Sequence, residues 1–389
     1  MGYNLLTPDL INLFLMTFPA DPEKIRTPRA MARREFLLGA AAVGGLASKY
    51  VRALPNSSAI SPPVRPVVDT AGSSEMLPSL VTPNTDFFIR NHFTAPVISE
   101  ENWNLEISGA VTTPLKLSYS DLLLGSSIRR PLTLECAGNP AGGSGVSTGV
   151  WSGVPLTELL KQAGLQPGAT TVIFHGADSG VAEGLPAGTH YVRAIPIEKA
   201  TDPTTLLAYE MNGAPLPPEH GFPLRALVAG WYGMDSVKWL TRVEVSQEPF
   251  QGYFQKQSYV ATTSKGDRRP ITGMHVNSKF IRPLENEGIR GKSYRIEGVA
   301  WAGDRKISKV ELRFASDGAW QPAVLPASQV PMVWTPWTYE WNVPRAGQYT
   351  IEVRATDDQG NAQPLVRDPD RLDEYELNNA HRVRVTVQT

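Results

Sequence analysis

The sequence predicts an α+β fold: a mixed α/β domain over residues 84–255, followed by an all-β, immunoglobulin-like sandwich over residues 256–389. Two patterns support this prediction. Before residue 250, short apolar β-prone runs alternate with short helical patterns. After residue 271, apolar and polar residues alternate in short stretches separated by turn signals, which is typical of a sandwich. The chain also has 33 glycines and 33 prolines, which favours many turns and short strands.

Local patterns place the elements of the first domain. The β-branched and apolar runs at 105–109 and 171–175 predict strands. Residues 120–124 and 155–163 predict short helices. In the second domain, strands are expected at 308–314, 320–325, 349–354 and 381–387.

Residues 1–53 are predicted to be a leader. Arg33 and Arg34 precede a short, weakly apolar run at 39–47, a pattern that resembles a twin-arginine export signal. An ordinary N-terminal helix with incidental arginines is the alternative. Residues 54–83 are rich in proline and serine and predict a tether. We therefore expect a periplasmic or otherwise exported protein.

The charge balance limits the partners. With 37 basic and 38 acidic residues, the net charge is close to zero. Nothing in the composition indicates a protein that binds a polyanion or a membrane surface, so no nucleic-acid partner is expected.

Cys136 is the single cysteine of the chain. It can form no internal disulfide, multi-thiolate zinc site or CxxC redox pair, which leaves an inert core residue, a nucleophile or one thiolate ligand to a metal. An apolar run at 131–134 precedes it, and small residues and glycines follow up to Gly149. A strand that delivers a thiol to a loop able to approach a bulky ligand favours the metal-ligand role.

Several motifs together resemble the sulfite oxidase family of molybdopterin-dependent oxidoreductases. The matching stretches, in chain order, are Phe87–His92, Leu134–Asn139, Tyr209–Gly213 with His220–Arg225, Val237–Leu240 and Asn378–Val383. The resemblance runs from Phe87 to the C-terminus. It implies a molybdopterin-binding domain of the sulfite oxidase type, followed by a dimerisation domain.

The resemblance also implies a molybdenum–molybdopterin cofactor and roles for individual residues. It implies that Cys136 is the metal ligand, which agrees with the preference of a sulfur-bound metal for a thiolate. It places Asn91, His92, Cys136, His220, Arg225, Ser236 and Lys238 at the cofactor, with backbone N–H groups around Ser236 as further phosphate donors. It places Arg90, Tyr259 and Trp151 at the substrate, in catalytic positions.

The sequence departs from the family where cations are expected. Pro140 and Ala141 stand where animal and plant members carry arginine, and Val150 stands at a position that is often basic. Each close charge pair near a surface contributes on the order of 1–4 kcal/mol, so the anion pocket is expected to bind more weakly. Arg193 is one residue that could compensate.

The expected function is oxidation of a small anionic substrate, sulfite, to sulfate. Electrons would pass to an external acceptor such as a cytochrome c, and the protein would form a homodimer through its C-terminal domain. Two alternatives stay open: a molybdopterin reductase of oxidised sulfur or nitrogen compounds, and a non-catalytic exported β-rich binding protein.

Overall fold

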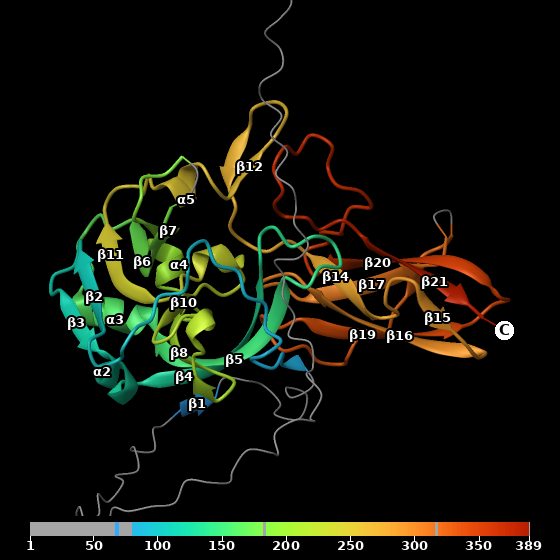
Figure 1. Cartoon of the computed structure of the whole chain (residues 1–389), viewed down its shortest axis with the longest axis horizontal. Helices are drawn as coiled ribbons and strands as arrows, with labels where there is room; N and C mark the ends of the chain where they lie inside the picture. Colours follow the sequence, from blue (N-terminus) through green and yellow to red (C-terminus); the bar gives the residue numbers. More distant parts are fainter. Residues whose placement is uncertain (1–66, 70–79, 182–183, 316–317, 389) are drawn as a thin grey trace, which may run out of the picture. The chain divides into compact units, whose positions relative to one another are not determined.

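The computed structural model describes residues 67–69, 80–181, 184–315 and 318–388 (Figure 1). The predicted leader, with its arginine pair, lies outside these residues, as does most of the predicted tether. Within the described stretches, no helix has the length and apolar character needed to span a membrane.

A six-stranded sheet carries the segment that leads to Cys136. Its strands in spatial order are β1 (Val67–Asp69), β4 (Ser127–Glu135), β5 (Val146–Pro155), β8 (Leu206–Met211) and β10 (Arg225–Leu227), with β9 (Ala214–Pro215) paired to β8. Strands β4 and β5 are antiparallel, and Glu135 pairs with Val146. The loop 136–145 therefore leaves and re-enters the sheet at one point, with Cys136 as its first residue.

A second, five-stranded sheet completes the first domain. Its strands in order are β3 (Leu115–Ser118), β2 (Asn104–Gly109), β11 (Leu240–Ser246), β6 (Thr171–Gly180) and β7 (Thr189–Pro196). The strands predicted at 105–109 and 171–175 are thus confirmed. The β6–β7 register shifts between His175 and Ser179, and such irregularities redirect side chains within a sheet.

The helices are short, as predicted at 120–124 and 155–163. They are α2 (Tyr119–Leu124), α3 (Leu156–Ala163), α4 (Ile197–Ala200) and α5 (Tyr253–Lys256), with 3₁₀ turns at Pro218–His220 and Gly233–Asp235. Helix α2 begins with a capping box. The Asp121 N–H donates to Ser118 Oγ at 3.2 Å, and the Ser118 N–H donates to the Asp121 carboxylate at 2.8 Å.

The second domain is the predicted sandwich. One sheet contains β14 (Asn277–Arg282), β16 (Ser293–Trp301) and β19 (Thr335–Asn342); the other contains β15 (Glu287–Ile289), β21 (His381–Val387), β20 (Gly347–Asp357), β17 (Ile307–Arg313) and β18 (Gln321–Pro322). Alternate residues of β21 are buried, as the sequence pattern predicted. Side chains of both sheets form one core cluster that includes Trp337 and Trp341. A hairpin of β12 (Val260–Thr262) and β13 (Arg268–Pro270) precedes the sandwich.

Two expectations about strands need correction. The strand predicted at 320–325 is only two residues long, because Pro322 lacks the N–H group needed to continue the ladder. Val324 instead exchanges hydrogen bonds with Thr338, at 2.8 and 3.1 Å. In addition, Val67–Asp69 of the predicted tether forms β1, which pairs in parallel with β4.

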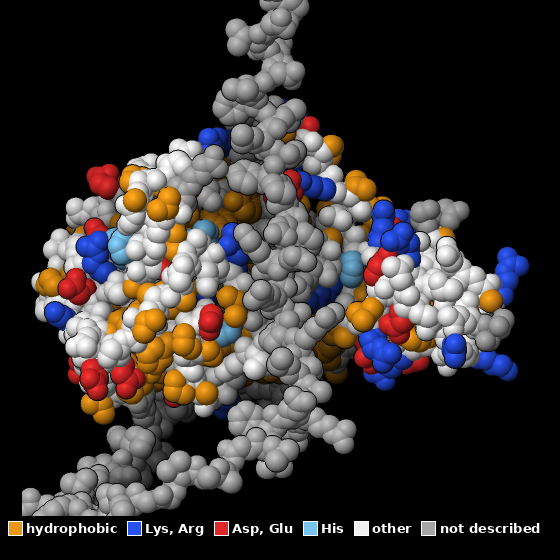
Figure 2. Space-filling view, viewed as in Figure 1, with side chains coloured by type: hydrophobic (Ala, Val, Ile, Leu, Met, Phe, Trp, Pro, Cys, Tyr) orange, Lys and Arg blue, Asp and Glu red, His pale blue; other side chains and the backbone are white. Residues whose placement is uncertain are grey.

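The drawn face of the molecule carries charges of both signs, in line with the balanced composition. On the face drawn in Figure 2, basic and acidic side chains are interspersed over the sandwich strands, with no broad field of one sign.

Candidate active site

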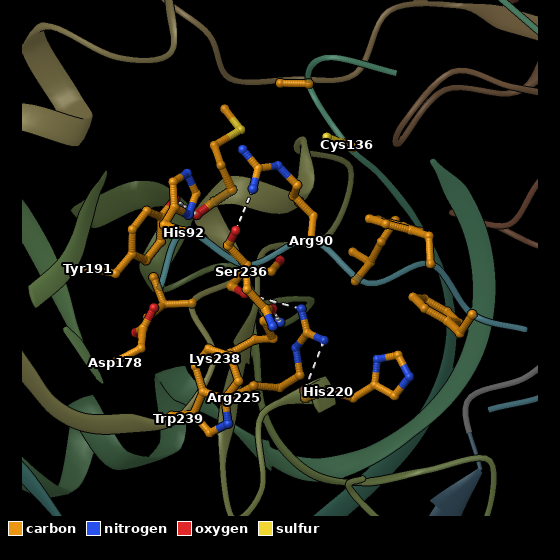
Figure 3. A pocket seen from close by; sticks show the side chains of 18 of the residues that line it. Arg90, His92, Cys136, Asp178, Tyr191, His220, Arg225, Ser236, Lys238 and Trp239 are labelled. Atoms are coloured by element: carbon orange, nitrogen blue, oxygen red, sulfur yellow. Dashed lines mark hydrogen bonds between the residues drawn. The ribbon is translucent and has the colours of Figure 1, made fainter. Parts of the chain in front are cut away.

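A pocket lined mostly by residues of the first domain gathers side chains from distant parts of the chain (Figure 3). It contains about 680 Å³ of space when the open space at its mouth is included. Cys136 and Arg90 lie toward one end of it, and Lys238, Arg225 and His220 toward the other. All the site residues predicted from the sequence except Trp151 line it: Arg90, Asn91, His92, Cys136, His220, Arg225, Ser236, Lys238 and Tyr259.

Trp151 lies behind the wall of the pocket rather than in it. The side chain is fully buried in β5, where its ring packs against Phe87 with 5.6 Å between centroids. The Arg225 guanidinium lies over the same ring at 5.1 Å. The predicted place of Trp151 beside the substrate is therefore corrected. Trp151 faces the core from a central strand, so it does not line the pocket, and it acts there only through its contact with Arg225.

The Cys136 loop is closed by its own backbone. The Cys136 N–H donates to the Gly145 carbonyl at 2.8 Å, and the Asn139 N–H donates to the Cys136 carbonyl at 2.9 Å. Burial raises the pKa of the Cys136 thiol, while the hydrogen bond from the Gly138 backbone and the charge of Arg90 lower it. The protein alone thus favours the neutral thiol, and a bound metal would keep it deprotonated.

Tyr259 and His92 form a neutral hydrogen-bonded pair. Tyr259 Oη lies 2.6 Å from His92 Nε2. Burial, followed by the positive charges of Arg90, Lys238 and Arg193, lowers the pKa of His92 to about 3. Burial also raises the pKa of Tyr259 above its ordinary value. At neutral pH both groups are uncharged, so the phenol keeps a proton that it can donate in a hydrogen bond.

Arg225 and Lys238 are cations held by backbone oxygens. Arg225 donates to the carbonyls of His220 at 3.1 Å and Ser236 at 3.2 Å. Lys238 Nζ donates to the Glu219 carbonyl at 2.7 Å and to the side chain of Asn91. Burial lowers the pKa of Arg225 to about 9, and burial together with the charge of Arg225 lowers that of Lys238 to about 7. Within the described part of the chain neither cation forms a salt bridge, although the charges of Asp178 and Glu219 act on Lys238 and raise its pKa. Two crowded cations of this kind fit a site for an anionic ligand.

Ser236 contributes differently from the prediction. Its backbone N–H is not free for a phosphate, because it donates to the Gly233 carbonyl at 3.1 Å within a 3₁₀ turn. Its Oγ accepts the Val228 N–H at 3.1 Å. The hydroxyl hydrogen of Ser236 is the group that can face a ligand.

Arg193 does not compensate for the missing arginines. It is buried and donates to the Asp235 carboxylate at 2.7 and 2.8 Å and to the Phe254 carbonyl. Because these partners occupy its guanidinium, Arg193 fixes the segments that carry Asp235 and Phe254 instead of binding substrate. That expectation is therefore wrong.

Two polar wall residues, Asp178 and Tyr191, were missed by the sequence analysis. Asp178 is buried where the β6–β7 register shifts, and its Oδ1 has no hydrogen-bond partner among the described residues. Burial raises the pKa of Asp178 to about 6. The Tyr191 ring stacks on His92 with 4.4 Å between centroids, and its hydroxyl donates to the Met234 carbonyl at 2.9 Å. An isolated acid and an isolated tyrosine in two strands carry no motif, so only the fold brings them to the pocket.

Two family models match the chain. An oxidoreductase molybdopterin binding domain matches residues 92–254, and a Mo-co oxidoreductase dimerisation domain matches residues 268–388. These matches leave the non-catalytic alternative without support. The finer domain boundaries given above remain predictions.

Curated relatives include two kinds of enzyme. The mitochondrial sulfite oxidase of Homo sapiens is 34% identical over 342 residues, covering 79% of this chain and 62% of that protein. An inducible NADH nitrate reductase of Glycine max is 33% identical over 333 residues, covering 73% of this chain and 37% of that protein. The chain thus spans less than two thirds of the length of either relative.

A solved structure supports the fold. The sulfane dehydrogenase SoxCD of Paracoccus pantotrophus aligns with a TM-score of 0.69, covering 80% of this chain and 84% of that chain. The two sequences are 24% identical, so the likeness concerns architecture.

The residues of the pocket fit a molybdenum–molybdopterin cofactor. Arg225 Nε and Asp178 Oδ1 are buried polar atoms without partners among the described residues, and they suit a ligand with both anionic and amine groups. Arg225 and Lys238 would hold the phosphate, Asp178 would accept from the pterin, and Cys136 would supply the thiolate. When bound, the cofactor supplies the redox chemistry that protein side chains lack.

Substituting Arg225 tests this assignment. In Arg225→Met we expect the molybdenum content of the purified protein to fall by about half or more, because charge-assisted hydrogen bonds contribute about 1.5–3 kcal/mol each. Arg242→Met is the matched control, since Arg242 is half-exposed on β11 and pairs with Glu244. Elemental analysis of both variants gives the comparison. Equal molybdenum contents would contradict a role for Arg225 in cofactor binding.

Proposed function

Because this chain belongs to the sulfite oxidase family of molybdopterin-dependent oxidoreductases, we propose that it oxidises sulfite to sulfate. One observation carries the proposal: the exposed cation Arg90 and the neutral Tyr259–His92 pair line the same pocket as Cys136. An anion that enters this pocket therefore meets the Arg90 guanidinium near Cys136 (Figure 3) and the hydroxyl of Tyr259, which lines the same pocket.

The protein groups have separable tasks in this reaction. Sulfite and water give sulfate, two protons and two electrons. Arg90 attracts and orients the anion, and Tyr259 Oη donates a hydrogen bond to one of its oxygens. His92 Nε2 stays within 2.6 Å of the Tyr259 oxygen, so it fixes the direction of the phenol. The two electrons pass to an external acceptor such as a cytochrome c.

The pocket has few other charges for the substrate. Pro140 is exposed, Val150 is buried in β5, and Arg193 is occupied by Asp235. On the described wall, Arg225 and Lys238 are held by backbone carbonyls at the end opposite Arg90. Arg90 then carries most of the electrostatic attraction for a small anion.

A reductase of oxidised nitrogen or sulfur compounds is the second candidate. It is supported by the similarity to nitrate reductases and by Arg90, the one arginine that the described residues place at the Cys136 end of the pocket. Its guanidinium donates to the Asn91 carbonyl, and its single charge suits a monoanion such as nitrate as well as sulfite. Steady-state assays separate the two candidates. Sulfite with ferricyanide or cytochrome c should give turnover, whereas nitrate with reduced viologen should give little. The reverse result would favour the reductase.

We also propose that the protein is exported and forms a homodimer through its second domain. The dimer is supported by the match to a dimerisation domain. Export rests on the arginine pair in the leader.

Replacing Arg33 and Arg34 with lysines should leave the protein in the cytoplasm. The twin-arginine route recognises the two arginines themselves, and lysines of the same charge do not replace them. Cell fractionation measures this, and normal export of the doubly substituted protein would contradict it.

A further inference from the structure

The carboxylate of Glu135 is buried immediately before Cys136. Its Oε2 accepts the Trp301 Nε1–H at 2.8 Å, and its Oε1 accepts N–H groups of Asn139 at 3.1 Å and Asn277 at 3.2 Å. A buried carboxylate is costly unless it is hydrogen-bonded, so these three donors determine where the Glu135 side chain lies.

One of these donors closes the loop that carries the thiol. Asn139 gives its amide N–H to Glu135 and accepts the Gly145 N–H on Oδ1 at 2.9 Å. Gly145 in turn accepts the Cys136 N–H at 2.8 Å. The position of the Glu135 carboxylate is thus linked through Asn139 to both ends of the loop 136–145.

The other two donors belong to the second domain. Trp301 on β16 and Asn277 on β14 are direct partners in the β-ladder, so they reach Glu135 from one place in the sandwich. Asn277 is itself held, because its Oδ1 accepts Gln363 Nε2 at 3.0 Å. The two donors are therefore held in place by the second domain, and together they fix the position of a carboxylate that belongs to the first domain.

The second domain also touches the Cys136 loop directly. The Glu376 N–H donates to the Ala137 carbonyl at 2.8 Å. Gly142 has a φ of +74°, and a Cβ atom there would lie 2.1 Å from His381 Nε2. This glycine allows the loop to approach β21 more closely than any side chain would permit.

We propose that Glu135 is a positioning residue for Cys136: its carboxylate, held by Trp301 and Asn277 of the second domain, sets where the thiolate meets the molybdenum. The proposal concerns the geometry of the metal ligand and does not depend on which substrate the protein oxidises. The second domain is then part of the catalytic unit in addition to any role in dimerisation.

The first test is Trp301→Phe in the full-length, cofactor-loaded protein. Phenylalanine keeps an aromatic ring in the site but removes the N–H that Glu135 Oε2 accepts. Loss of a hydrogen-bonding partner behind a metal ligand typically costs roughly 10–100-fold in activity or metal affinity. We expect an altered electron paramagnetic resonance spectrum of the molybdenum centre. We also expect a kcat about tenfold lower and a KM for sulfite within about twofold of wild type.

Trp337→Phe is the matched control. Trp337 is buried in the core of the same sandwich, and its Nε1 has no hydrogen-bond partner among the described residues. This variant should lower Tm, as Trp301→Phe should, but leave the spectrum and kcat unchanged. Equal spectral changes in both variants would mean that general loosening of the sandwich is responsible, and would overturn the proposal.

Glu135→Gln provides a second variant in case Trp301→Phe does not fold. Glutamine keeps the shape of the side chain, but one of its terminal atoms becomes a donor that faces N–H groups. We expect a spectral change like that of Trp301→Phe. If the molybdenum-loaded Glu135→Gln protein has the wild-type spectrum and kcat, Glu135 does not position Cys136 and the proposal fails.

Discussion

Replacing Cys136 with serine is expected to lower the oxidation rate by orders of magnitude while the fold and the bound pterin are retained. A hydroxyl is a poor substitute for a soft thiolate, and its proton is much harder to remove. The side chain lies at the first position of a loop closed by backbone hydrogen bonds, which serine preserves. The measurements are kcat with sulfite, molybdenum content and pterin content of the same preparation.

Ser144→Ala is a suitable control for the Cys136 variant. Ser144 is an exposed residue of the same loop, and it does not line the pocket. The control should keep wild-type turnover. Near-wild-type turnover in Cys136→Ser would contradict the assignment of the thiolate as a metal ligand.

Arg90→Met is expected to lower kcat/KM for an anionic substrate roughly 10- to 100-fold. Hydrogen bonds to charged groups contribute about 1.5–3 kcal/mol, and about 1.4 kcal/mol corresponds to a factor of ten. Methionine removes the charge and keeps much of the apolar stem. The loss should appear mainly in KM if Arg90 binds the ground state and the transition state equally.

A neutral substrate provides the control for Arg90. Turnover of a sulfoxide should change far less than turnover of sulfite, because a neutral molecule gains little from the guanidinium. Equal losses with the two substrates would mean that Arg90 supports the cofactor, and the assignment of the substrate end of the pocket would be wrong.

The wall of the pocket was largely predictable because its residues lie in short local motifs. A few consecutive residues were enough to identify the strand before Cys136 and the segments at 87–92 and 220–238 as parts of the site. Trp151 belongs to such a segment too, but a motif does not report which face of a strand a side chain occupies. The structure places Trp151 on the buried side, behind Arg225.

Contacts between distant segments could not be predicted. Trp301 reaches Glu135 across 166 residues of sequence, and Tyr375 of the second domain packs on Tyr259 with 5.1 Å between ring centroids. The pairing of Arg193 with Asp235 likewise depends on how β7 meets a 3₁₀ turn. Each of these contacts is a product of tertiary packing, and local patterns do not encode it.

If the protein oxidises sulfite as we propose, sulfite reduces the molybdenum centre through the pocket formed by Cys136, Arg90 and Tyr259. The most direct measurement is anaerobic addition of sulfite to the molybdenum-loaded protein without an electron acceptor, with sulfate and the absorption of the centre followed together. We expect one sulfate per molybdenum, formed as the centre is reduced, since each oxidation releases two electrons. A fully loaded protein that forms no sulfate and shows no change in absorption would contradict it.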